Sequence, residues 1–281
     1  MSTAPLSWLE PDWPAPANVR AAVSLRAGGV SEGPYASLNL AAHVGDDPAV
    51  VAENRRRLRA ALALPAEPLW LDQVHGNVVA EADQARNAVP AGPVAIAPPT
   101  ADAAVAHSPG QVCVVLTADC LPVLICDRHG THVAAAHAGW RGLAGGVLDA
   151  TVAALVSTER VSERATERTT GRTTGRTRPA ELIAWLGPAI EPEAFEVGDE
   201  VREAFLARDR AHETAFSRNA RGRWQADLYR LARRELLRLG VGEVHGGGFR
   251  CHADRERFYS YRRDGRTGRM ASLIWLQRTV P

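Results

Sequence analysis

Lysine is absent from the sequence: all 33 basic residues among the 281 are arginine, and they stand against 32 acidic residues. The absence of lysine excludes every reaction that proceeds through a lysine Schiff base. The formal net charge is only +1, so the composition provides no electrostatic basis for binding nucleic acid or an anionic membrane surface. The function must therefore be sought in particular side chains.

Paired metal-binding and redox motifs are also missing. The four cysteines form no Cys-x-x-Cys pair, which excludes a zinc ribbon or a redox dithiol; they are Cys113, Cys120, Cys126 and Cys251. No apolar run is long enough to span a bilayer. The N-terminal residues lack the basic start and apolar stretch of a signal peptide, so we expect a cytoplasmic protein without a membrane partner.

What is present is an ordinary globular composition, 46% apolar and 23% charged, in a chain long enough for a full hydrophobic core. Apolar β-rich runs and amphipathic stretches interleave without a regular βα alternation, which predicts an α+β (mixed α/β) fold. We expect strands over 111–116, 122–126, 131–137, 181–186 and 270–276, and helices over 47–64, 139–156, 200–207 and 227–239.

Residues 157–180 interrupt this pattern, since they repeat TER and TTGR and offer few apolar side chains. Such a segment cannot offset its ordering entropy by burial. We therefore predict a disordered insertion at 157–180 within a single domain of residues 1–281. Residues 81–100, rich in proline and alanine, are expected to form a loop.

The strands on either side of the Asp-Arg-His-Gly turn are expected to form a hairpin with a two-residue loop, a register that places Cys120 opposite His137. Directly opposed residues have Cβ atoms roughly 4.5–5.5 Å apart, so a thiolate and an imidazole there could share a zinc ion. Pro122 weakens this register, because proline interrupts a ladder unless it lies at an edge or bulge. His75, in the DQVHG turn, is a third candidate ligand. An inert buried thiol, a core histidine and an exposed turn histidine are the alternatives.

Other polar residues lie in places that composition does not explain. Arg26, Asn39 and His43 are candidate catalytic residues. They belong to a Gly- and Asn-rich stretch, RAGGVSEGPYASLNLAAHVGDD, whose alternative interpretation is a turn-rich surface loop. Asp102 and Asp119 could orient histidines as hydrogen-bond partners.

The sequence resembles the bacterial YfiH family over nearly its whole length. The motifs that carry the resemblance are RAGGVSEGPYASLNL, HVGD, DQVHG, TADCLPVLICD, AAHAGWRGL, LGPAI and RFYSYRRDGRTGRMASLIWL. Members of the family have been called multicopper polyphenol oxidoreductases or laccases, purine nucleoside phosphorylases and peptidoglycan editing factors. The resemblance implies a layered mixed α/β fold with two sheets between helices, and one zinc ion held by His75, Cys120 and His137.

The resemblance also implies activity on purine nucleosides: phosphorolysis of adenosine, inosine and methylthioadenosine, and deamination of adenosine to inosine. Phosphorolysis needs a cation for phosphate, and Arg26, Arg262 and Arg263 are available; the last two lie beside tyrosines and could equally form a solvated charged face. His43, near Arg26 and Asn39 in the sequence, is the expected proton-transfer residue, because a histidine pKa near 6.5 suits that role. We expect purine nucleosides and phosphate as partners, and a monomer or homodimer.

Four other functions remain open at this stage. A copper-dependent, laccase-like polyphenol oxidase is disfavoured, because the nine histidines form no His-x-His pair, although one such site could still bind Cu²⁺. An amidase that removes L-serine from UDP-MurNAc-L-Ser could use the same zinc, with its open position for water. A metal-free enzyme could use Cys120 as a nucleophile activated by His137, and zinc could be purely structural.

Overall fold

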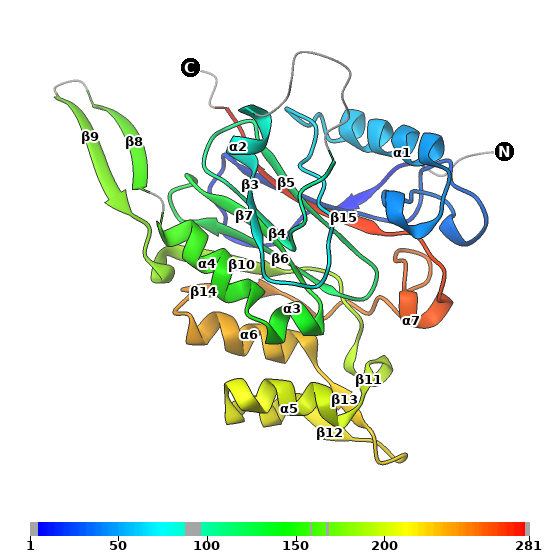
Figure 1. The fold of residues 1–281 in the computed structure, drawn as a ribbon. Coiled ribbons are helices and arrows are strands. Elements are labelled where there is room, and N and C mark those ends of the chain that lie inside the picture. The colour runs from blue at the N-terminus through cyan, green and yellow to red at the C-terminus, as the bar shows by residue number, and fades with distance from the viewer. Residues whose placement is uncertain (1–4, 88–96, 158, 167–168, 279–281) are drawn as a thin grey trace.

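The computed structural model describes residues 5–87, 97–157, 159–166 and 169–278. Two β-sheets form the centre of the molecule (Figure 1). The larger sheet contains, in spatial order, β14 (Glu243–Gly246), β10 (Leu182–Leu186), β6 (Leu121–Asp127), β7 (Val133–Ala138), β4 (Ala103–Ala106) and β3 (Val79–Glu81). Its edge pairs β10–β14 and β3–β4 are parallel, and the inner pairs are antiparallel.

The smaller of the two sheets is antiparallel throughout. Its order is β1 (Trp8–Leu9), β2 (Val19–Ser24), β15 (Met270–Leu276) and β5 (Val112–Thr117). Strands β5, β6, β7, β10 and β15 are buried along their whole length. Their continuous apolar runs are typical of strands covered on both faces, and all five strands expected from the sequence are confirmed.

The two sheets pack face to face and helices cover their outer faces. Val115 and Ile274 of the smaller sheet meet Leu124 and Trp185 of the larger one in the central core. The outer face of the smaller sheet packs on α1 (Pro48–Ala61) through Leu58. The outer face of the larger sheet packs on α3 (Trp140–Ala144), α4 (Val147–Ser157) and α6 (Leu228–Arg238). This arrangement confirms the expected layered fold, with two sheets between helices.

The predicted helices are present, with one difference. Asp47 caps α1 by accepting a hydrogen bond from the amide of Ala49, with Pro48 in the first turn, as the residue types predict. The helix expected over 139–156 is instead broken into α3 and α4. Gly146 takes a φ of +89° at the break, a left-handed conformation that favours glycine and ends the helical hydrogen-bond pattern.

A small third sheet lies beside this core and forms part of the pocket described below. It consists of β11 (Glu196–Val197), β13 (Trp224–Ala226) and β12 (Phe216–Arg218), and it contacts α5 (Asp199–Arg208). In Figure 1 these elements form the lower part of the molecule, and α7 (Tyr261–Asp264) lies at the right.

Two segments were expected to lack regular structure. Within 157–180, for which disorder stays a prediction, the described residues include β8 (Glu159–Thr166) paired with β9 (Thr169–Arg176) as a hairpin that projects from the molecule in Figure 1. Threonine-rich alternation permits such pairing, but an isolated two-stranded hairpin is marginally stable in water. Within the expected loop 81–100, a short helix α2 (Ala82–Asn87) forms, and residues 88–96 lie outside the described residues.

In the described ranges, no helix is both long and apolar enough to cross a membrane.

Candidate metal centre and its pocket

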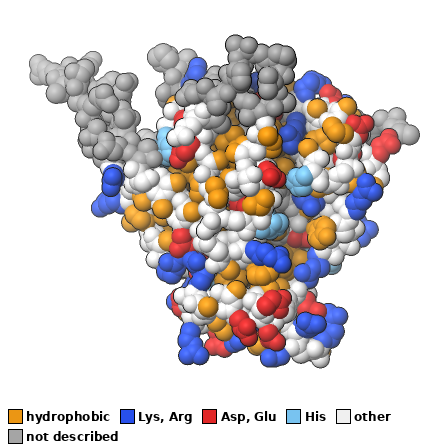
Figure 2. All heavy atoms as spheres, in the orientation of Figure 1, with side chains coloured by type: hydrophobic (Ala, Val, Ile, Leu, Met, Phe, Trp, Pro, Cys, Tyr) orange, Lys and Arg blue, Asp and Glu red, His pale blue; other side chains and the backbone are white. Residues whose placement is uncertain are grey.

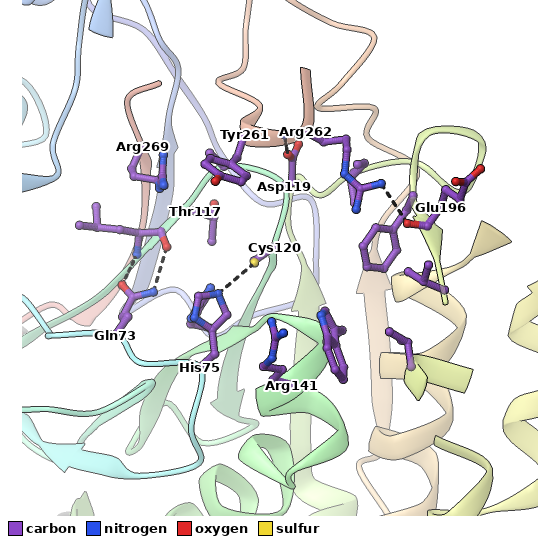
Figure 3. A pocket seen from close by; sticks show the side chains of 18 of the residues that line it. Gln73, His75, Thr117, Asp119, Cys120, Arg141, Glu196, Tyr261, Arg262 and Arg269 are labelled. Carbon is purple, nitrogen blue, oxygen red and sulfur yellow. Dashed lines mark hydrogen bonds between the residues drawn. The ribbon is translucent and has the colours of Figure 1, made fainter. Parts of the chain in front are cut away.

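Three side chains from separate parts of the chain converge on one point. His75 lies in the loop before β3, Cys120 directly precedes β6, and His137 lies in β7. One ligand atom from each lies within 4.8 Å of the others, and Cys120 Sγ is 3.8 Å from His75 Nε2 (Figure 3). One sulfur and two imidazole nitrogens at this spacing form a set of donors that could hold a metal ion.

The strand register differs from the one expected. Pro122, and not Cys120, lies opposite His137. The turn between β6 and β7 is wider than two residues, because the Asp127 carboxylate accepts hydrogen bonds from the amide (2.7 Å) and hydroxyl (2.8 Å) of Thr131. The register shift is two residues. Cys120 lies just before the paired residues of β6, and its sulfur still comes within 4.8 Å of the ligand atoms of both histidines. The predicted pairing was wrong, but the predicted proximity is confirmed.

A buried carboxylate organises two of the three side chains. Asp102 is fully buried and accepts a 2.8 Å hydrogen bond from His137 Nδ1. It also accepts backbone N–H bonds from Val74 (3.2 Å), His75 (2.9 Å) and Gly76 (2.6 Å). Burial alone would raise the pKa of Asp102, but these hydrogen bonds hold it below its ordinary value. His137 is left with Nε2 as its ligand atom.

The backbone around the cluster is shaped to bring the side chains close. His75 (φ 62°) and Asp119 (φ 92°) take left-handed conformations, which non-glycine residues rarely adopt. A Cβ on Gly139 would lie 2.8 Å from His75 Cδ2 and 3.0 Å from Cys120 Sγ. Only glycine therefore fits between these two side chains.

The electrostatics of the cluster favour an ionised thiol. Burial would raise the pKa of Cys120, but the charge of His137 and hydrogen bonds from both histidines outweigh it and lower the pKa to about 6. Burial would likewise lower the pKa of His137, but Cys120 and Asp102 raise it to about 9. A thiolate is the form of cysteine that binds metals.

The cluster opens into a pocket of about 830 Å³. His137 is buried, Cys120 is half-buried and His75 is exposed, so the donor set is accessible from one side. One wall is apolar and comes from Trp140, Ile190, Phe195, Val197 and Val201. Figure 2 shows histidine side chains among hydrophobic ones on the middle of this face of the molecule, with acidic and basic side chains gathered below.

Two of the other predicted site residues line this pocket. His43 lies there in the single turn Ala42–Val44. Its side chain is open to solvent on one side, and partial desolvation of the ring by the surrounding protein is the first cause that lowers its pKa, followed by the charge of Arg269. Arg262 also lines the pocket, and its Nη1 donates to the carbonyls of Ala194 and Glu196.

The remaining three predicted residues are not among those that line the pocket. Arg26 donates to the carbonyls of Ala36 and Arg255. Asn39 is fully buried, and its Nδ2 donates to the carbonyl of Ala41 and the carboxylate of Asp46. The Arg263 guanidinium donates to three main-chain carbonyls and to a neighbouring carboxylate. Their donors are used to hold loops, which the local sequence did not reveal.

Among the polar residues that line the pocket and that sequence reasoning missed are Gln73, Arg141, Arg223 and Arg269. Gln73 clamps the end of β5 by bonding both the amide (2.7 Å) and the carbonyl (2.9 Å) of Leu116. Arg141 and Arg269 carried a signal, since each lies in a motif of the family resemblance. Arg223 had none, because it reaches the pocket from the turn between β12 and β13.

Comparison with known proteins agrees with this architecture. The chain is 54% identical over 272 residues to a purine nucleoside phosphorylase of Pseudomonas aeruginosa, covering 96% of this chain and 99% of the relative. It is 49% identical to the purine nucleoside phosphorylase YfiH of Escherichia coli, covering 95% and 97%. The crystal structure of a Neisseria meningitidis protein of the DUF152 family superposes with a TM-score of 0.83 at 48% identity, covering 96% and 99%. Residues 20–277 match the family described as multi-copper polyphenol oxidoreductase laccase, and the chain belongs to this YfiH-type family.

Proposed function

We propose that this chain is a zinc-dependent purine nucleoside enzyme. It carries out phosphorolysis of adenosine, inosine and methylthioadenosine and deaminates adenosine to inosine, with the metal held by His75, Cys120 and His137. The observation that carries the proposal is a His/Cys/His cluster, accessible from one side, that lines a pocket with an apolar wall and several arginines. Two relatives that are named purine nucleoside phosphorylases point the same way.

The donor set fits zinc. Zinc accepts thiolate and imidazole ligands together, and catalytic zinc sites keep three protein ligands and one open position. The hydrogen bond from His137 Nδ1 to Asp102 is the carboxylate–histidine arrangement that fixes the tautomer of a metal ligand. Held by these three residues, zinc would supply a Lewis acid that lowers the pKa of water, which is the chemistry needed to exchange the amino group at C6 of adenine for oxygen with release of ammonia.

The chain's own residues supply binding and proton transfer for phosphorolysis. A phosphate oxygen attacks C1′ of the ribose while the bond from C1′ to N9 of the purine breaks. The electron pair of that bond passes to the purine, and the proton lost by phosphate ends on the departing base. His43, at the pocket rim, is the residue proposed to transfer that proton. The apolar wall around Trp140 and Phe195 is suited to the flat face of a purine.

A specific observation disfavours multicopper oxidase chemistry. In the part of the chain that the structure describes, one cluster has three or more candidate metal ligands. Oxidation by several coupled copper ions would need further ligand clusters beside it. A single Cu²⁺ could occupy the same three ligands, which makes the identity of the metal a matter for measurement.

The test combines metal content with turnover. We expect one zinc per chain by mass spectrometry, and conversion of adenosine to inosine without phosphate and to adenine and ribose 1-phosphate with it. Cys120→Ala should lose both zinc and turnover. Cys113→Ala, which removes a buried thiol from the core between the sheets, is the matched control and should keep both.

Three outcomes would contradict the proposal. Zinc without any nucleoside turnover would favour the amidase that acts on UDP-MurNAc-L-Ser. Turnover that depends on Cys120 in a metal-free protein would favour a thiol nucleophile. Turnover that Cys120→Ala retains would remove this cluster from the reaction altogether.

A further inference from the structure

The pocket is lined by four arginines with unequal surroundings: Arg141, Arg223, Arg262 and Arg269. Arg141 and Arg223 are exposed, so water already solvates their charges. Arg262 is also exposed, and its Nη1 already donates hydrogen bonds to the carbonyls of Ala194 and Glu196. Arg269 is half-buried, and burial lowers its pKa against the opposing pull of Cys120 and Asp119.

The Arg269 guanidinium is fixed in place but incompletely paired. Its Nη1 donates to the carbonyls of Thr267 (3.0 Å) and Gly268 (3.1 Å). Within the described part of the chain, no carboxylate lies within ion-pair distance of it, and no hydrogen bond from its Nε or Nη2 is found. The Cys120 thiol lies close enough to act on its charge, and the guanidinium faces the Tyr261 ring with 5.8 Å to the ring centroid, but neither contact uses the Nε and Nη2 donors. Two open guanidinium donors match two oxygens of an oxyanion.

The loop architecture connects Arg269 with the expected proton-transfer residue. The Asn39 side-chain oxygen accepts hydrogen bonds from the amides of both Arg269 (3.0 Å) and Ala41 (3.0 Å). Ala41 directly precedes the turn that carries His43, and His43 senses the charge of Arg269. Asn39, which does not line the pocket, is therefore a positioning residue that fixes the backbone of Arg269 relative to the turn that carries His43. In Figure 3, Arg269 lies on the side of Gln73, away from Glu196.

We propose that Arg269 is the binding residue for inorganic phosphate in phosphorolysis, held beside His43 by Asn39, and that the base occupies the apolar wall on the opposite side. The inference rests on the proposed function, of which it names the phosphate subsite. Neither Arg262 nor Arg263 is then the main phosphate ligand. Phosphate bound at Arg269 would lie near the residue proposed to move its proton to the base.

The first experiment separates the kinetic constants of the two substrates. For Arg269→Gln we expect the KM for phosphate in inosine phosphorolysis to rise about 10- to 100-fold, because hydrogen bonds from a charged donor are lost. The KM for inosine should change by less than about threefold, because the base and ribose keep their contacts. Arg269→Lys should recover part of the phosphate affinity, since lysine keeps the positive charge but lacks the two parallel N–H donors of the guanidinium. Deamination of adenosine consumes no phosphate and should survive in both variants. Arg257→Gln removes an exposed arginine that pairs with Asp254. It is the control, because it changes the net charge by the same amount as Arg269→Gln.

The second experiment uses the unaltered protein, so it stands even where a variant fails to fold. Phenylglyoxal modifies arginines, and peptide mapping reports each site. We expect inorganic phosphate to protect Arg269, while Arg257 is modified equally with and without it. An unchanged KM for phosphate in Arg269→Gln, or protection of Arg262 or Arg141 in place of Arg269, would overturn the inference and leave the proposed function intact. If the unaltered protein turned over no nucleoside, the proposed function would fail, and protection by phosphate would still decide the subsite.

Discussion

Replacing Asp102 by asparagine should disable the metal centre while the fold survives. The carboxylate accepts four hydrogen bonds, three from the amides of Val74, His75 and Gly76 and one from His137 Nδ1. Asparagine offers one acceptor oxygen and one NH₂ group. If the NH₂ faces His137, the ring must accept at Nδ1 and carry its proton on Nε2, the atom left for the metal. If the NH₂ group faces Val74 and Gly76, it meets two backbone N–H donors and leaves them without an acceptor in the loop that holds His75.

The magnitude follows from these contacts. Each hydrogen bond to a charged acceptor contributes about 1.5–3 kcal/mol, and removing one partner of a buried charged pair costs about 3–5 kcal/mol. We therefore expect Asp102→Asn to reduce the free energy of unfolding by about 3 kcal/mol and to lower the Tm by roughly 5–10 °C. Loss of a carboxylate that orients a metal-bound histidine should weaken zinc binding about 10- to 100-fold.

A matched control separates the two effects. Asp127 is equally buried and accepts three hydrogen bonds from Thr131 and His132 in the β6–β7 turn. Asp127→Asn should destabilise the protein to a similar degree and keep its zinc affinity. The assay is competition against a zinc chelator, at a temperature well below both melting transitions. Equal zinc affinity in Asp102→Asn and the unaltered protein would refute the assigned role of Asp102.

Two further predictions concern the cluster itself. In the metal-free protein, iodoacetamide should alkylate Cys120 at a rate that rises between pH 5 and 7 and is level above pH 7, because His137 lowers the thiol pKa to about 6. Bound zinc should block the reaction. An alkylation rate that still rises through pH 9 would contradict the pairing of Cys120 with His137. Gly139→Ala should reduce bound zinc, because its Cβ would lie 2.8 Å from His75 Cδ2. Gly76→Ala should keep its zinc, since its Cβ would meet its nearest atom at 3.5 Å, and similar zinc content in both variants would show that this crowding is unimportant.

The local pattern predicted elements whose signals are contained in short segments. The cap at Asp47 and the continuous apolar runs of β5, β6 and β7 reflect interactions between near neighbours in the chain. Gly145 and Gly146 marked a weak point in the helix expected over 139–156, but the sequence did not predict a break there, because whether such a glycine is tolerated or ends the helix depends on what packs around it. The register of the β6–β7 hairpin was missed because the Asp127 carboxylate decides the turn, and the residue types alone allowed a tighter one.

By itself, the sequence determined which groups could perform chemistry: Cys120, His137 and His75 in their motifs, and arginine as the source of every permanently charged cationic side chain. Only the tertiary structure decided how those groups are used. It brings His75 to within 3.8 Å of a cysteine 45 residues away. Among the residues that the structure describes, it leaves two donors of Arg269 without a partner, while carbonyls engage Arg26 and Arg263. The physical reason is that charge, burial and hydrogen-bond partners depend on contacts between distant segments, whereas a motif records only the residue types that make those contacts possible.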